Sequence, residues 1–219
     1  VREVILDRKV GKLTEQDATL LFDKAIESSI TLQERAGLDE ITDGEWRRES
    51  YVKVFAERVR GFQPDLNISG MPYPAVVAPI EYYRPLALEE LQFIRSRTMC
   101  RVKITLPAPY IIGRRMWHPD HSKKAYSRPE LLMEACVPIL RREIESLRDA
   151  GVDTVQLDEP WLSTMVDPVF CQREGIDNPL NEMDRCVDLV NQVLDGFDDL
   201  ATGMHLCHAH FDRLHGTEG

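Results

Sequence analysis

The same structural unit recurs along this chain: a helix, a tight turn with glycine, a short apolar strand and a polar terminus. The first copy places a helix over residues 14–35, Gly37 in the turn and a strand at 40–42. The second copy places a helix over 127–149 and a strand at 154–157. The repetition favours a parallel α/β architecture, because consecutive parallel strands need a crossover connection, usually a helix.

Capping residues predict where the two helices begin. Thr14 followed by Asp17 forms an approximate capping box for the first helix. Ser127 followed by Glu130 predicts a capping serine and a returning glutamate for the second helix.

Two further segments extend the pattern, and one segment breaks it. A looser third copy has helical spacing over 183–197 and then a strand that leads to His205. Another apolar, β-branched strand is expected over 100–106. Residues 62–93 are rich in proline and carry several tyrosines, so we interpret residues of about 50–97 as an excursion from the regular fold.

Polar side chains follow three of the predicted strands. They are Glu45 after the first strand, Asp158 and Glu159 after the strand at 154–157, and His205 with Cys207 at the end of the last one. In α/β folds, active sites lie outside the carboxyl ends of the strands. The pattern therefore predicts an enzyme whose site is at this edge of the sheet.

The segment from 204 to 210 is rich in metal-ligating side chains. If the strand continues, His205 and Cys207 point to the same face, and imidazole and thiolate both suit zinc. The alternative is a buried cysteine beside a hydrogen-bonded histidine. His208 and His210 are further candidate ligands, and His210 shares the face of His205 and Cys207 if the strand continues.

Composition excludes some classes of protein. The chain has 219 residues, 43% of them apolar, with a net charge of −10, which argues against general nucleic-acid binding. No apolar run is long enough to span a membrane. The five cysteines lack the spacing of a disulfide scaffold, which is typical of a cytoplasmic protein.

Three motifs, in this order, resemble the cobalamin-independent methionine synthase family. They are Thr-Asp-Gly-Glu-Trp-Arg-Arg at 42–48, Leu-Asp-Glu-Pro at 157–160 and His-Leu-Cys at 205–207. The first motif and Thr-Leu-Pro-Ala-Pro at 105–109 are similar to the shorter, single-barrel members. The resemblance implies a (β/α)8 TIM barrel of the methionine synthase/uroporphyrinogen decarboxylase type, with residues 1–219 forming part of one catalytic domain.

The resemblance also implies a reaction and roles for residues. A zinc ion, held in part by His205 and Cys207, activates the thiol of homocysteine for attack on the methyl group of a methyltetrahydrofolate. Glu45 and Asp158 hold the amino group of the amino-acid substrate. Glu159 is a second candidate for that contact, or else caps the following loop. From their own chemistry, Arg47 and Arg48 either bind carboxylates, which for Arg47 would belong to the substrate, or form local salt bridges. The family does not use the position of His210 as a ligand, so we interpret His208 and His210 as solvated residues or as supports for the site.

The chain departs from the family's barrel in extent. The predicted strands correspond to the second through the fifth of eight, so the remaining zinc ligands are expected outside this sequence. We expect a fragment or one part of a split protein. In isolation, with only two ligands, this chain is expected to bind zinc weakly or not at all. The oligomeric state stays undetermined. The alternatives are related zinc-dependent alkyl transfer to another thiol, such as coenzyme M, and a non-catalytic barrel homologue.

Overall fold

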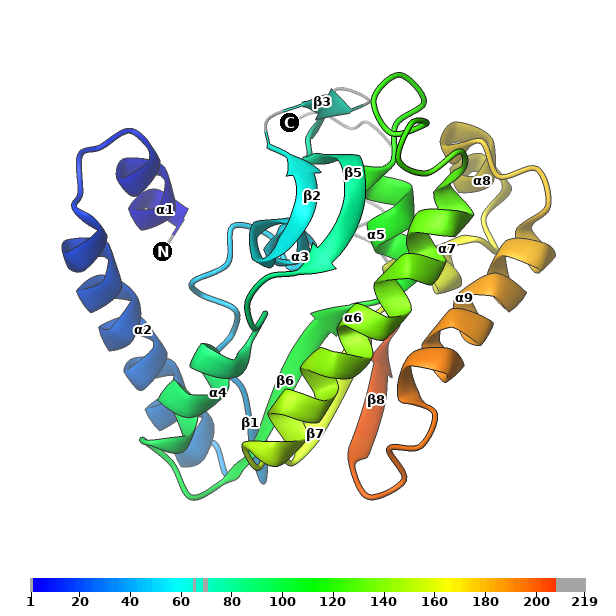
Figure 1. The fold of residues 1–219 in the computed structure, drawn as a ribbon. Coiled ribbons are helices and arrows are strands. Elements are labelled where there is room, and N and C mark those ends of the chain that lie inside the picture. The colour runs from blue at the N-terminus through cyan, green and yellow to red at the C-terminus, as the bar shows by residue number, and fades with distance from the viewer. Residues whose placement is uncertain (1, 65, 69–70, 208–219) are drawn as a thin grey trace.

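Four parallel strands form the central sheet of the computed structural model, which describes residues 2–64, 66–68 and 71–207. The strands are β1 (Glu40–Ile41), β6 (Arg101–Pro107), β7 (Thr154–Asp158) and β8 (Ala201–His205), in the spatial order β1-β6-β7-β8 (Figure 1). The register joins Ile41 to Val102, Leu106 to Leu157, and Asp158 to His205. The sheet confirms the predicted parallel α/β fold.

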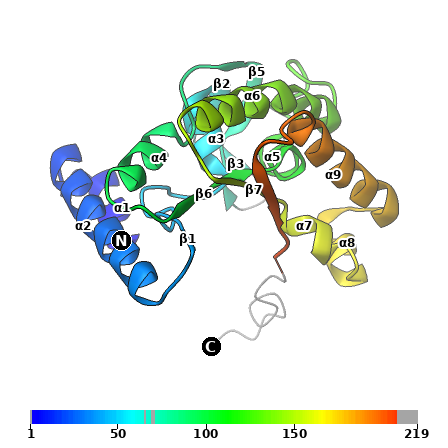
Figure 2. The same cartoon turned by 90° about the horizontal axis from the view of Figure 1, so that it is seen from below.

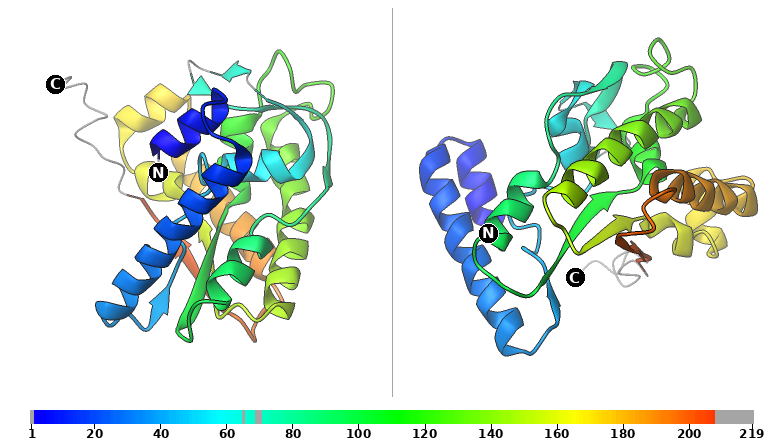
Figure 3. Two further views of the ribbon diagram at one scale, coloured as in Figure 1. Left: turned by 90° about the vertical axis from the view of Figure 1, so that its left-hand side faces the viewer. Right: turned by 60° about the horizontal axis from the view of Figure 1, so that its bottom comes forward.

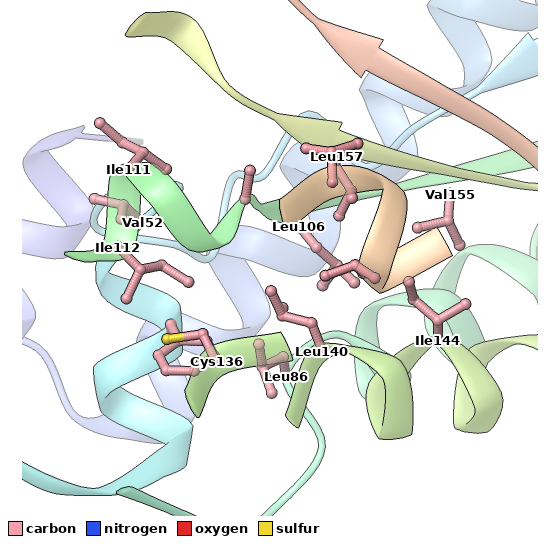
Figure 4. Packing of buried hydrophobic residues seen from close by; sticks show 14 of the residues in the cluster. Val52, Leu86, Leu106, Ile111, Ile112, Cys136, Leu140, Ile144, Val155 and Leu157 are labelled. Carbon is pink, nitrogen blue, oxygen red and sulfur yellow. The ribbon is translucent and has the colours of Figure 1, made fainter. Parts of the chain in front are cut away.

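Each strand of the sheet is preceded in the chain by a helix that lies outside the sheet (Figure 2). These helices are α2 (Glu15–Arg35) before β1, α4 (Leu88–Arg95) before β6, α6 (Pro129–Asp149) before β7, and α9 (Pro179–Leu194) before β8. Leu106, Val155 and Leu157 point from the strands towards Leu140 and Ile144 of α6 (Figure 4). These side chains are fully buried, so the main core lies between the sheet and its helices, and the inner face of the sheet carries the polar residues.

Helix α2 begins as predicted, whereas α6 does not. The Thr14 hydroxyl accepts a hydrogen bond from the Asp17 N–H (3.1 Å). For α6 the N-cap is Arg128, with no side-chain cap, so the predicted capping serine at Ser127 is wrong. Pro129 occupies the first turn, where its fixed φ starts a helix and its missing N–H leaves one donor fewer to satisfy.

The segment between β1 and β6 contains an antiparallel unit. Its elements are α3 (Lys53–Arg58), β2 (Val59–Gln63), β3 (Asn67–Ile68), β4 (Met71–Pro72) and β5 (Ala75–Tyr82), with β2 paired to β5 and β3 to β4. The buried Glu143 of α6 accepts hydrogen bonds from the Ala87 N–H (2.8 Å) and the Tyr82 hydroxyl (3.2 Å). This carboxylate therefore fixes the antiparallel unit to the outer layer of helices.

The remaining helices are short. They are α1 (Arg2–Lys9), α5 (Pro109–Met116), α7 (Pro160–Thr164) and α8 (Pro168–Glu174). Helix α1 folds back along α2 through a small separate cluster of Ile5, Ala18 and Phe22 (Figure 3). Among the described residues, no helix has the length and apolarity needed to cross a lipid bilayer.

Candidate active site

A hollow of about 420 Å³ lies at the carboxyl ends of the parallel strands. We call it the strand-end hollow, and it is lined by Glu45, Tyr51, Thr105, Gln156, Asp158, Pro160, His205 and Cys207. Four residues predicted from the sequence are therefore brought together: Glu45, Asp158, His205 and Cys207. The other two, Glu159 and Arg47, do not line it.

Strand register places the polar side chains of this wall. Asp158 at the end of β7 is the Cα partner of His205 at the end of β8. Thr105 of β6 is the Cα partner of Gln156, which precedes Asp158 by two residues. Because alternate residues of a strand share a face, Gln156 and Asp158 both point to the inner face, and the Gln156 amide donates to Asp158 Oδ1 (2.8 Å).

The backbone at Glu45 is held in an unusual conformation. Its φ is 57°, the only positive value at a non-glycine residue in the described chain, and it follows Gly44 with a φ of 71°. The Glu45 N–H donates to Asp43 Oδ1 (3.0 Å), and the Gly44 N–H donates to Thr42 Oγ1 (3.0 Å). Such strained residues cluster at functional sites, where the surrounding structure must maintain them.

Two donors hold the Glu45 side chain. Arg48 Nη1 lies 3.3 Å from Glu45 Oε1, and the Thr105 hydroxyl donates to the same oxygen. Arg48 is buried and also forms a two-pronged ion pair with Glu90 of α4, in which its Nε lies 2.9 Å from Glu90 Oε1. The tandem arginines at 47 and 48 signal carboxylate partners, but the sequence alone does not show which one turns inward.

The carboxyl group of Asp158 is poised by burial and neighbouring charges. Burial raises its pKa above the ordinary range, and the nearby Glu45 carboxylate raises it further. The hydrogen bond from Gln156 and the charges of His205 and Arg48 act in the opposite direction. Two carboxylates facing one hollow repel each other, so a cationic ligand between them is favoured electrostatically.

Glu159 is fully buried and faces away from the strand-end hollow. One carboxylate oxygen accepts from the Ile111 N–H at the start of α5 (3.1 Å), and the other accepts from the Trp161 N–H at the start of α7 (3.4 Å). Burial raises its pKa to about 8. Its position corresponds to the capping role that the sequence left open.

Arg47 points to a different part of the molecule. Its guanidinium pairs with Asp23 of α2 and lies 4.6 Å from the centre of the Phe93 ring of α4. These contacts correspond to the local pairing that was the alternative to substrate binding.

His205 and Cys207 reach the hollow, but not along one strand. Strand β8 ends at His205, so the alternation of faces does not extend to Cys207, contrary to the expected strand geometry. The Glu159 N–H donates to the His205 carbonyl (3.1 Å), and the Ser163 hydroxyl donates to the Cys207 carbonyl (2.6 Å). The segment after β7 therefore fixes both backbone positions.

The described residues supply an incomplete set of metal ligands. Up to Cys207, with the gaps stated above, no three His, Cys, Asp or Glu side chains are grouped to hold a metal ion. The predicted roles of His208 and His210 lie outside the described residues. His205 and Cys207 match the donor types that zinc takes, but two donors fall short of the four that a tetrahedral site needs.

Tyr51, Thr105 and Gln156 also line the hollow and were not expected from the sequence. Gln156 could have been found by counting back two residues from Asp158 along the strand, and Thr105 by pairing β6 with β7. Tyr51 follows the loop after β1 without a regular spacing. Burial raises the pKa of its phenol, which keeps the hydroxyl protonated.

Comparison with known proteins identifies relatives over nearly the whole chain. The sequence model of the family described as "Cobalamin-independent synthase, Catalytic domain" matches residues 1–216. A methionine synthase of Sulfurisphaera tokodaii is 30% identical over 220 residues, covering 98% of this chain and 59% of the relative. The methionine synthase of Saccharolobus solfataricus is 30% identical over 217 residues and is covered to 59%. The chain thus spans about 59% of the length of these relatives.

A solved structure has the same fold. The B12-independent methionine synthase of Shewanella sp. W3-18-1, in complex with selenomethionine, superposes with a TM-score of 0.70 at 26% identity. The match covers 90% of this chain and 54% of the Shewanella chain. The parallel sheet described above therefore corresponds to part of a larger barrel.

Proposed function

Because this chain belongs to the cobalamin-independent synthase catalytic-domain family, we propose that the full-length protein transfers a methyl group from a methylated folate to the thiol of homocysteine, giving methionine. One observation carries the proposal. Two carboxylates, an imidazole and a thiol, delivered after three different strands, line the same strand-end hollow.

Glu45 and Asp158 bind the ammonium group of the amino-acid substrate. An ammonium ion offers three hydrogen-bond donors and one positive charge, which offsets the repulsion between the two carboxylates. The Shewanella relative was solved with selenomethionine, an analogue of the proposed product, which supports amino-acid binding as a property of the family.

His205 and Cys207 hold zinc together with ligands from the rest of the full-length protein. Zinc, when bound, deprotonates a coordinated thiol, which is otherwise mostly protonated at neutral pH. The Glu159 and Ser163 hydrogen bonds to the two backbone carbonyls keep both donor side chains at the hollow.

The transfer itself is a displacement at the methyl carbon. The substrate sulfur forms the new bond to carbon, the bond from that carbon to the folate nitrogen breaks, and the nitrogen takes up a proton. The chain's contribution is to orient the amino-acid end at Glu45 and Asp158, so that the thiol end extends towards His205 and Cys207. Fixed orientation of this kind accounts for a large share of enzymatic rate enhancement.

The test uses the full-length protein, purified under reducing conditions. Zinc content is measured per chain, and methyl transfer is assayed with homocysteine and coenzyme M as acceptors and with several methylated folates as donors. Stoichiometric zinc with methionine formation is expected. Transfer to coenzyme M without transfer to homocysteine contradicts the proposed acceptor. A protein without zinc and without transfer is a non-catalytic homologue.

A further inference from the structure

Arg48 lies between helix α4 and the strand-end hollow. We propose that Arg48 and Thr105 are positioning residues that fix one oxygen of the Glu45 carboxylate, so that the other oxygen, Oε2, is presented to the ligand's ammonium group. The inference rests on the proposed function, because it concerns how the amino-acid end is recognised.

Arg48 makes six acceptor contacts with the five N–H groups of its guanidinium, so one N–H of Nη1 is shared between two acceptors. Nε and Nη2 donate to the two oxygens of Glu90, which is a two-pronged pair. Nη1 and Nη2 each lie 3.0 Å from the Thr105 carbonyl oxygen, and Nη1 also reaches Glu45 Oε1 (3.3 Å). A planar guanidinium with five donors can satisfy this set, whereas an ammonium with three donors cannot.

Thr105 connects the arginine to the carboxylate. Its hydroxyl accepts from Arg48 Nη1 (3.2 Å) and donates to Glu45 Oε1. Glu45 Oε1 therefore receives two donors. Among the described residues, no hydrogen bond or ion pair involves Glu45 Oε2, while Glu45 itself lines the hollow.

Burial makes this arrangement rigid. The side chain of Arg48 is 3% exposed and that of Glu90 is 9% exposed. Burial alone lowers the pKa of Arg48, but the Glu90 carboxylate more than offsets it and keeps the guanidinium charged. Removing one member of such a pair leaves an uncompensated buried charge, so the pair has little freedom to rearrange.

The same helix provides a matched control. Arg58 pairs with Glu89 of α4 (3.2 Å), the residue next to Glu90. This second ion pair joins α3 to α4, the helix that also carries Glu90, and contacts neither Glu45 nor Thr105.

The experiment compares four variants of the full-length protein: Thr105→Val, Thr105→Ser, Arg48→Lys and Arg58→Lys. Methionine affinity is measured by calorimetry, and thermal unfolding establishes that each variant is folded. In the methyl-transfer assay, KM for homocysteine is separated from kcat. Thr105→Val is the decisive variant, because it removes the hydroxyl and leaves the buried ion pair intact.

Thr105→Val and Arg48→Lys are expected to weaken methionine binding about tenfold, the effect of one charged hydrogen bond, and to raise KM more than they lower kcat. Thr105→Ser keeps the hydroxyl, so its methionine affinity is expected to stay within about threefold of wild type. Arg58→Lys, the control variant, is expected to stay within the same range. Wild-type affinity in folded Thr105→Val contradicts the inference alone, as does equal weakening in Thr105→Ser. A wild-type protein that binds no methionine and transfers no methyl group overturns the proposed function and the inference together.

Discussion

The backbone N–H of Glu159 donates a hydrogen bond to the carbonyl oxygen of His205 (3.1 Å). This contact joins the two sequence motifs at the ends of β7 and β8. Of the two adjacent acids, Asp158 lines the strand-end hollow, whereas the side chain of Glu159 is buried in the core. The two adjacent acids thus have different surroundings: Asp158 is available to a ligand in the hollow, and Glu159 accepts hydrogen bonds from the starts of α5 and α7.

Asp158→Asn is expected to weaken methionine binding by about tenfold or more, because an ammonium ion would lose a charged acceptor in a partly buried site. Calorimetry on the full-length protein measures the change. Asp153→Asn serves as the control. Asp153 directly precedes the first residue of β7 and pairs with Arg95, so this variant should bind methionine with wild-type affinity. Equal affinity of Asp158→Asn and wild type would show that this carboxylate does not hold the ligand.

Glu159 is expected to make stability depend on pH. Its pKa is about 8 in the folded protein against an ordinary 4.5. Below the lower value both states are protonated, and the contribution to stability is fully present. As pH rises towards 8, the unfolded chain releases its proton first, so the free energy of unfolding falls by up to about 1.4 kcal/mol per pH unit.

Denaturant unfolding at pH 5, 6, 7 and 8 tests this slope. Glu159→Gln cannot ionise, so its unfolding free energy should vary less over this range than that of wild type. Parallel pH profiles for the two proteins would mean that Glu159 is ionised throughout, stabilised by its two backbone donors.

Cys207→Ser is expected to reduce zinc affinity at least tenfold, since even residues that only orient a ligand contribute about that much. Competition with a chelator measures the affinity in the full-length protein. Cys100→Ser, at a partly buried cysteine outside the strand-end hollow, should keep wild-type zinc. Unchanged zinc in Cys207→Ser would exclude this thiol as a ligand.

Gly44→Ala is expected to destabilise the protein more than Gly37→Ala does. Both glycines have positive φ values, 71° and 75°, so each alanine is strained by about 1–2 kcal/mol. A Cβ at residue 44 would also collide with the Trp46 ring, whereas a Cβ at residue 37 meets open space. Thermal unfolding gives the comparison, and methionine affinity should fall only in Gly44→Ala. Equal unfolding temperatures would show that the Trp46 ring moves aside freely.

Much of the fold followed from local patterns. The recurring unit of helix, turn and short strand predicted the strands that end at Asp158 and His205, and the Thr14 cap predicted the start of α2. Parallel pairing then placed Asp158 beside His205. The strands and the cap depend on neighbours within a few residues, which is why a sequence reveals them.

Other features depend on contacts between distant segments. Nothing in the spacing of Arg47 and Arg48 shows that the first meets Asp23 and the second meets Glu90. The burial of Glu159 likewise depends on where α5 begins after β6. Strand β8 ends at His205, so Cys207 lies beyond the strand on which both residues were predicted to share a face. The two-residue spacing of His205 and Cys207 does not reveal where strand pairing stops.

The pair of Arg48 and Glu90 spans 42 residues of chain, and the whole antiparallel unit lies inside that span. The contact can form only when this segment of chain has closed into a loop, which has an entropic cost. The packing of the antiparallel unit and its hydrogen bonds to Glu143 must offset that cost. The carboxylate network at Glu45 is therefore complete only once the chain segments on both sides of the antiparallel unit have met.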